Sequence, residues 1–208
     1  MRKTHLTATL AALVAILVLA TAALAANFQG TDGNDTYAGT PESDVVIGKG
    51  GNDTLGGAGA NDEIRGDDGD DGLSGGEGDD KAKGGQDDDV VNGDAGDDKL
   101  DGGRGDDTVS GGGDADKLKG GRGKDVLDGG DGNDVINARG DGSKGGPDTI
   151  TCGAGTDTVR ADRNDTVAAD CENVKKPGQN AKGQDKDKGK DKGKDKDKGP
   201  KAPKGPKT

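Results

Sequence analysis

Residues 102–110 read GGRGDDTVS, and this nine-residue unit recurs along most of the chain. Its sixth residue is an aspartate, and so is every ninth residue over twelve consecutive units. A glycine stands five residues before each of these aspartates, and an apolar residue stands two residues after each. Three columns that keep one phase over twelve units indicate a structural repeat and not a biased composition. The aspartates are Asp35, Asp44, Asp53, Asp62, Asp71, Asp80, Asp89, Asp98, Asp107, Asp116, Asp125 and Asp134.

The glycines of one unit predict a loop, and the residues after the aspartate predict a strand. Glycine allows positive φ angles and close backbone approach, so positions one to six are expected to form a tight loop. Positions seven to nine, residues 108–110 in this unit, are expected to form a very short strand with one inward apolar residue. Glycine at this density disfavours helices. If two units close one coil, the sequence predicts an all-β solenoid whose loops stack in two columns.

The phase breaks after Asn137, where an insertion of five residues lengthens one unit, and it resumes with Asp148, Asp157 and Asp165. Two cysteines, Cys152 and Cys171, lie 19 residues apart in this region, which is almost one coil. Residues one coil apart in a parallel sheet are separated by about 4.8 Å, within the Cα range of a disulfide. We therefore expect a disulfide that staples the last coil; the alternative is a pair of buried free thiols.

The units resemble the nonapeptide of the RTX (repeats-in-toxin, hemolysin-type) calcium-binding family, written G-G-x-G-x-D-x-U-x with U a large apolar residue. The resemblance covers residues 30 to about 167. It implies a right-handed parallel β-roll in which Ca²⁺ lies between loops one coil apart. It also implies that the position-six aspartates, including Asp148, Asp157 and Asp165, hold the ions together with loop carbonyls.

Some units depart from this motif, and the sites beside them are expected to be weaker or distorted. Position two is Thr, Lys, Ala or Asp in several units. The residues that replace glycine at position four are Glu42, Ala60, Asp87 and Asp114.

The charge of the repeat region gives an independent reason for a metal. Residues 26–174 carry 36 acidic and 14 basic residues, a net charge of −22 that repels itself around a thin apolar core. Calcium accepts six to eight oxygen ligands with flexible geometry, whereas magnesium is smaller and retains its water. Twelve loops in two columns leave five gaps per column, which predicts about ten Ca²⁺ ions. We expect the chain to be disordered without calcium, because binding energy is then folding energy. The alternative, a metal-free solenoid, would stack repelling carboxylates about 4.8 Å apart.

The two ends differ in composition from the repeats. Residues 1–25 resemble a secretory signal peptide, with Arg2 and Lys3 before an apolar stretch and a small-x-small pattern at residues 23–25. Residues 175–208 contain 13 Lys and 5 Asp with almost no apolar residue, so we expect a disordered tail. The tail is either a solvated spacer or a segment that contacts an anionic cell-surface polymer.

Catalytic constellations are missing from the repeat region. The single histidine, His5, lies in the predicted signal peptide, which excludes a histidine base or a His-containing metal site in the body. An acidic body also argues against nucleic-acid binding. The sequence thus predicts a secreted, non-enzymatic calcium-binding β-roll over residues 26–174, with no transmembrane segment and no cofactor other than Ca²⁺. The alternative is a surface-associated adhesion or matrix module, with the rod as stalk and the Lys-rich tail as anchor.

Overall fold

The computed structural model describes residues 24–140 and 146–178. These residues form seventeen strands and no helix, and hence no helix that could cross a membrane. Most of the predicted signal peptide, residues 1–25, and most of the predicted tail, residues 175–208, lie outside the described residues.

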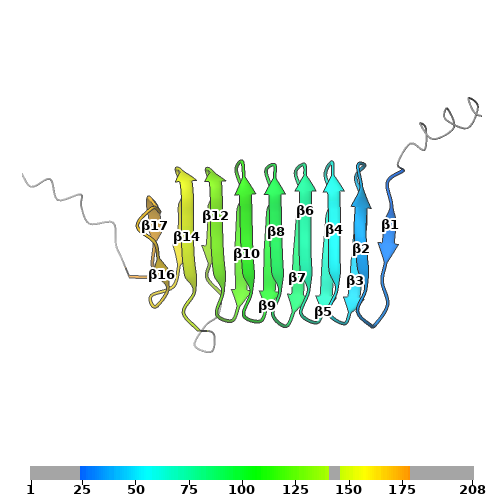
Figure 1. The fold of residues 1–208 in the computed structure, drawn as a ribbon. Helices are drawn as coiled ribbons and strands as arrows, with labels where there is room; N and C mark the ends of the chain where they lie inside the picture. Colours follow the sequence, from blue (N-terminus) through cyan, green and yellow to red (C-terminus); the bar gives the residue numbers. More distant parts are fainter. Residues whose placement is uncertain (1–23, 141–145, 179–208) are drawn as a thin grey trace, which may run out of the picture. The chain divides into compact units, whose positions relative to one another are not determined.

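Successive strands alternate between two parallel sheets, so each coil contributes one strand to each sheet (Figure 1). We call them the odd sheet and the even sheet, after the numbers of their strands. The odd sheet contains β1 (Asn27–Gln29), β3 (Val45–Gly50), β5 (Glu63–Asp68), β7 (Lys81–Gln86), β9 (Lys99–Arg104), β11 (Lys117–Arg122), β13 (Val135–Ala138), β15 (Thr158–Ala161) and β17 (Asn173–Lys175). The even sheet contains β2 (Thr36–Thr40), β4 (Thr54–Gly59), β6 (Gly72–Glu77), β8 (Val90–Ala95), β10 (Thr108–Gly113), β12 (Val126–Gly132), β14 (Thr149–Gly155) and β16 (Thr166–Val167).

The register confirms a parallel β-solenoid with two nine-residue units in each coil. In the even sheet Val109 lies opposite Val91 on one side and Leu127 on the other, each 18 residues away. Leu127 in turn lies opposite Ile150, 23 residues away. The five-residue insertion therefore leaves the ladder between β12 and β14 intact.

The core is the predicted single column of apolar residues, two residues after each position-six aspartate. Their side chains point between the two sheets and are almost fully buried, including the small Ala82. The column consists of Val46, Leu55, Ile64, Leu73, Ala82, Val91, Leu100, Val109, Leu118, Leu127, Ile136, Ile150 and Val159. Because each coil adds only two such side chains, the core remains thin along its whole length.

The strands are longer than the sequence predicted, and the loops are shorter. In the unit 102–110, the first three residues end β9, residues 105–107 form the loop, and the last three begin β10. The prediction of a three-residue strand and a six-residue loop was therefore wrong. Glycine explains the difference, because Gly112 pairs with Gly130 at a φ of 114°. The strand therefore continues through a corner with positive φ, a conformation that glycine adopts without strain and that Lys49, Ala58, Asp67 and Asp94 adopt at the same position of other units.

An additional strand, β1, precedes the first predicted unit and caps the N-terminal end. Phe28 pairs with Val46 and stacks on Tyr37, with ring centroids 4.4 Å apart. The sequence contained the signal, since Phe28 stands nine residues before Tyr37 and so keeps the phase of the core column. The aromatic pair covers the end of the core where no further coil follows.

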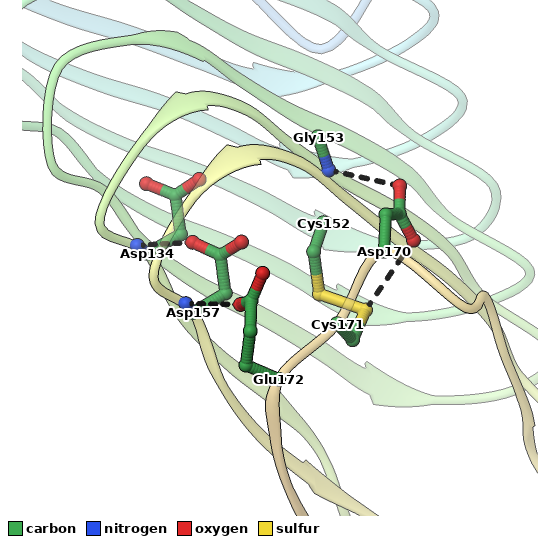
Figure 2. Close-up of a disulfide and its surroundings, with 7 residues drawn as sticks. All are labelled: Asp134, Cys152, Gly153, Asp157, Asp170, Cys171 and Glu172. Atoms are coloured by element: carbon green, nitrogen blue, oxygen red, sulfur yellow. Dashed lines mark hydrogen bonds between the residues drawn. A yellow bond between two sulfur atoms is a disulfide. The ribbon is translucent and has the colours of Figure 1, made fainter.

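The C-terminal end is closed by the predicted disulfide between Cys152 and Cys171, with Cα atoms 5.2 Å apart (Figure 2). Cys152 is fully buried in β14, and Cys171 follows β16. Arg139 strengthens this end by donating hydrogen bonds to the Ala161 carbonyl at 3.2 Å and the Lys175 carbonyl at 2.8 Å. The last coils are thus tied together by covalent and polar contacts in addition to the sheet ladder.

Replacing both cysteines, Cys152→Ala with Cys171→Ala, should loosen the last coil. Closing a loop of this length contributes about 3 kcal/mol in the chain-entropy model. We expect faster amide hydrogen exchange in β16 and β17, with β6 to β10 unchanged as the internal control. Unaltered exchange in β16 and β17 would show that the disulfide does not hold this end.

Candidate metal sites along the aspartate ladder

The position-six aspartates lie at the two edges where strands begin, and their side chains are buried. From Asp44 to Asp165 they are at most 6 % exposed, whereas Asp35 is half-buried. Burial of so many carboxylates requires specific partners, because charged side chains are seldom fully buried alone. One column precedes the odd strands and contains Asp44, Asp62, Asp80, Asp98, Asp116, Asp134 and Asp157. The other precedes the even strands and contains Asp35, Asp53, Asp71, Asp89, Asp107, Asp125, Asp148 and Asp165.

From Asp44 to Asp165, one oxygen of each carboxylate in this ladder joins two neighbouring coils, as the Asp116 unit illustrates. The Asp116 Oδ1 atom accepts the backbone N–H of Asp98 at 2.8 Å. The Asp116 N–H donates in turn to Asp134 Oδ1 at 2.9 Å. Its carbonyl accepts the Val135 N–H at 2.8 Å. The repeated aspartate therefore satisfies the backbone at the point where the strand ladder is interrupted by the loop.

A second ladder runs through position five in the opposite direction. Asp79 Oδ1 accepts the Asp97 N–H at 3.1 Å, and Asp97 Oδ1 accepts the Ala115 N–H at 2.9 Å. These side chains are exposed and contact the following coil, whereas the position-six side chains contact the preceding one. Each loop is thus fixed to both of its neighbours.

The other carboxylate oxygen, Oδ2, is buried and has no hydrogen-bond partner at many positions of the described chain. A buried charged oxygen without a partner carries a large desolvation cost, which a cation or a proton would relieve. This arrangement recurs in Asp53, Asp62, Asp71, Asp80, Asp89, Asp98, Asp107, Asp116, Asp134 and Asp157.

The glycine at position one makes room for this oxygen. A Cβ atom built on Gly111 would overlap both Asp116 Oδ2 and the Gly129 carbonyl oxygen, which comes from the next coil. Two oxygens from adjacent coils therefore converge on one face of Gly111. The same convergence occurs at Gly93, where Asp98 Oδ2 and the Gly111 carbonyl meet.

The donor set fits calcium better than a transition metal. Among the described residues, no three side chains of His, Cys, Asp or Glu gather around one point. A bound cation would therefore draw on one or two carboxylates and on backbone carbonyls from neighbouring loops. Calcium accepts such mixed oxygen ligands, whereas zinc prefers clustered nitrogen and sulfur donors. The oxygens of Asp116 and Gly129 match this requirement.

The aspartates at the ends of the two columns differ from those between them. Asp35 Oδ2 accepts the Thr31 N–H at 2.6 Å, and Asp44 Oδ2 accepts the Thr40 N–H at 2.7 Å. Asp165 Oδ2 similarly accepts a backbone N–H, from Asp162. Backbone donors thus occupy the oxygen that stays open in the central units.

A residue that the sequence analysis did not select, Glu172, ends one column. Asp134 donates its N–H to Asp157 Oδ1, and Asp157 donates its N–H to Glu172 Oε2, both at 2.8 Å (Figure 2). Glu172 therefore replaces the aspartate of the next coil. Its signal was present in the sequence, because Glu172 precedes the apolar Val174 by two residues, as each repeat aspartate precedes its core residue.

The same burial changes the acidity of the carboxyl groups in the metal-free coil. Desolvation raises their pKa most, hydrogen bonds from the preceding coil partly oppose the rise, and nearby carboxylates add to it. The pKa is raised to about 6 for Asp71, Asp80 and Asp98 and to about 7 for Asp89, Asp107 and Asp116. The metal-free coil therefore tends to hold protons near neutral pH.

Comparison with known families agrees with this geometry. The family model for the RTX calcium-binding nonapeptide repeat matches six overlapping or adjacent segments between residues 29 and 168. No curated protein matches the chain as a relative. The matched segments are residues 29–64, 48–82, 74–109, 83–118, 110–142 and 144–168.

Acid should stabilise the metal-free coil. The folded carboxyls with a pKa of about 6 to 7 bind protons that unfolded aspartates, at about 3.9, release. Stability is therefore gained as the pH falls through 7 and 6, and it is lost as the pH rises again. Circular dichroism of metal-free protein should show more strand at about pH 5 than at about pH 8. Less strand at the lower pH would contradict the raised pKa values.

Adding a methyl group at position one should damage a site. Gly111→Ala places its Cβ against Asp116 Oδ2, and overpacking of this kind costs about 1–3 kcal/mol. Gly113→Ala in the same strand is the matched control, because a Cβ there meets nothing closer than 4.0 Å. The calcium concentration at the midpoint of folding should rise for Gly111→Ala alone. Equal midpoints for the two variants would show that the glycine column does not make room for the ligand oxygen.

Proposed function

Because the chain belongs to the RTX calcium-binding nonapeptide-repeat family, we propose that it is a secreted protein that folds when its loops bind about ten Ca²⁺ ions. Its role is to bind ions and to form a calcium-stiffened rod, and we propose no catalytic activity. The observation that carries the proposal is the row of buried Oδ2 atoms without hydrogen-bond partners.

The charge balance supports the proposed number of ions. Ten divalent cations would carry about +20, close to the −22 of residues 26–174. The ions would bind only the coiled state, because the ligands of one site come from loops one coil apart. Binding energy would therefore stabilise the fold directly.

The chain's own residues have distinct tasks in this proposal. Calcium supplies positive charge where the carboxylates are desolvated. Asp116 would hold one ion through Oδ2, and it keeps its loop attached to the preceding coil through Oδ1. The Gly129 carbonyl supplies an oxygen from the following coil. Loss of the ion would leave the Asp116 oxygen without a partner, which favours opening of the coil.

We propose that the terminal aspartates close the columns and do not supply an open oxygen. Asp35, Asp44 and Asp165 already accept backbone N–H groups at Oδ2. The ions would then occupy loops whose aspartate has a buried Oδ2 without a hydrogen-bond partner, such as those of Asp53, Asp98 and Asp116.

Export and surface attachment are proposals that rest on the sequence alone. A predicted signal peptide over residues 1–25 would deliver the chain to a calcium-rich exterior. In the alternative role, an adhesion or matrix module, the Lys-rich residues 175–208 would hold the rod at an anionic surface.

Calcium titration of metal-free protein at neutral pH should produce the strand signal in circular dichroism, and calorimetry should give about ten sites. Magnesium should be much less effective, because it retains its water. Asp116→Asn should remove about one site and weaken the folding transition, since its Oδ2 position loses the charge. A full strand signal in excess chelator at neutral pH would overturn folding on binding.

The matched control for that variant is Asp114→Asn, two residues away. Asp114 is exposed and has a φ of 72°, a conformation that asparagine also adopts. It changes the net charge by the same amount but touches no proposed ligand oxygen. A similar loss of sites in both variants would show that general charge, and not the position-six carboxylate, governs binding.

A further inference from the structure

The two sheets differ sharply in charge. The strands of the even sheet carry no Lys or Arg, and their charged residues are all acidic. The odd strands β3 to β15 carry ten Lys or Arg and four Asp or Glu. The outer face of the odd sheet is therefore a basic surface on a strongly acidic body.

An open groove of about 800 Å³ lies on this basic face. Its walls come from six neighbouring coils of the odd sheet. The lining residues lie on β3, β5, β7, β9 and β11 and directly after β13. Strands in a sheet are about 4.8 Å apart, so the groove is about 25 Å long. The basic residues that line it are Lys49, Lys83, Arg104, Lys119, Arg122 and Arg139.

The acidic residues in the groove offset only part of this charge. Asp67, Asp68 and Asp101 line the same groove. Lys119 forms an ion pair with Asp101 at 2.9 Å. Six basic and three acidic side chains leave a net positive charge in the groove.

The two central arginines of the groove lie next to each other without an acidic partner. Arg104 and Arg122 occupy facing positions of β9 and β11. Arg104 donates a hydrogen bond to Gln86 Oε1 at 3.4 Å, and neither arginine forms an ion pair within the described residues. Like charges in facing positions of a sheet repel each other and destabilise it. An anion bound between the two guanidinium groups would replace this repulsion with two attractive contacts.

We propose that this groove binds an acidic polysaccharide with repeated carboxylate groups. Arginine forks bind carboxylates through paired hydrogen bonds, which suits Arg104 and Arg122. Asp67 and Asp68 supply acceptors for sugar hydroxyl groups, which a simple polyanion would not require. The length of the groove fits a linear polymer better than a small anion.

Nucleic acid fits this groove less well. Binding of single strands relies on aromatic side chains that stack on bases, and the described aromatic residues, Phe28 and Tyr37, lie at the β1–β2 end outside the groove.

The proposal goes beyond calcium binding, and it predicts that calcium controls it. The groove exists only when six coils are stacked, so binding should need the folded rod. The Lys-rich tail is a separate cationic segment, and its attraction to polyanions would persist in the unfolded chain. Calcium dependence therefore distinguishes the groove from the tail.

The test uses the full chain loaded with calcium and a fluorescent hyaluronan oligosaccharide, measured by anisotropy at low ionic strength. The variant Arg104→Gln with Arg122→Gln should weaken binding about tenfold or more. The matched control, Lys99→Gln with Lys117→Gln, removes the same charge from the same strands β9 and β11 at positions outside the groove. It should weaken binding by about twofold at most.

Lys99 and Lys117 directly follow the proposed ligands Asp98 and Asp116, so the calcium midpoint of folding is measured for both double variants and binding is compared at calcium concentrations well above both midpoints. Equal weakening by the two double variants would overturn the groove and indicate general charge attraction. Equal binding in excess chelator would assign the interaction to the tail. A single-stranded oligonucleotide that binds as tightly, with the same dependence on Arg104 and Arg122, would overturn the choice of polysaccharide.

Discussion

Many of the repeat aspartates, such as Asp98 and Asp116, accept a backbone hydrogen bond at one carboxylate oxygen and have no hydrogen-bond partner at the other. The rest of the structure depends on this division of roles. Oδ1 holds the preceding coil in register, as Asp116 holds the N–H of Asp98. Oδ2 faces the glycine of its own unit and, in units such as that of Gly111, a carbonyl of the next coil. The same side chain thus positions the backbone and creates a need for positive charge.

The carboxylates explain how coils with so thin an apolar core can still stack on one another. Each coil adds two buried apolar side chains, such as Leu118 and Leu127, and two buried carboxylates. The carboxylates favour the coil only when a cation or a proton compensates them, which is why burial raises the pKa of Asp107 to about 7. Folding and ion binding would therefore be one process, with the strand ladder transmitting order from coil to coil.

Outside the core, the two sheets present different chemistry to solvent. Two units per coil send odd strands to one face and even strands to the other. Basic residues at positions two, three, seven and nine, such as Arg104 and Lys119, consequently gather on one face. The repeat fixes the aspartate columns at the two edges, whereas the outward residues of the two faces can differ.

The nine-residue phase by itself determined the two-sheet solenoid, the inward column from Val46 to Val159, the pairing of Cys152 with Cys171 and the family. These features follow from local spacing, which a sequence displays directly. Strand length and the hydrogen bond through which Glu172 ends one aspartate column were decided only by the tertiary structure. Each depends on contacts between residues 15 to 18 positions apart, and the sequence places these residues in separate units until coiling brings them together.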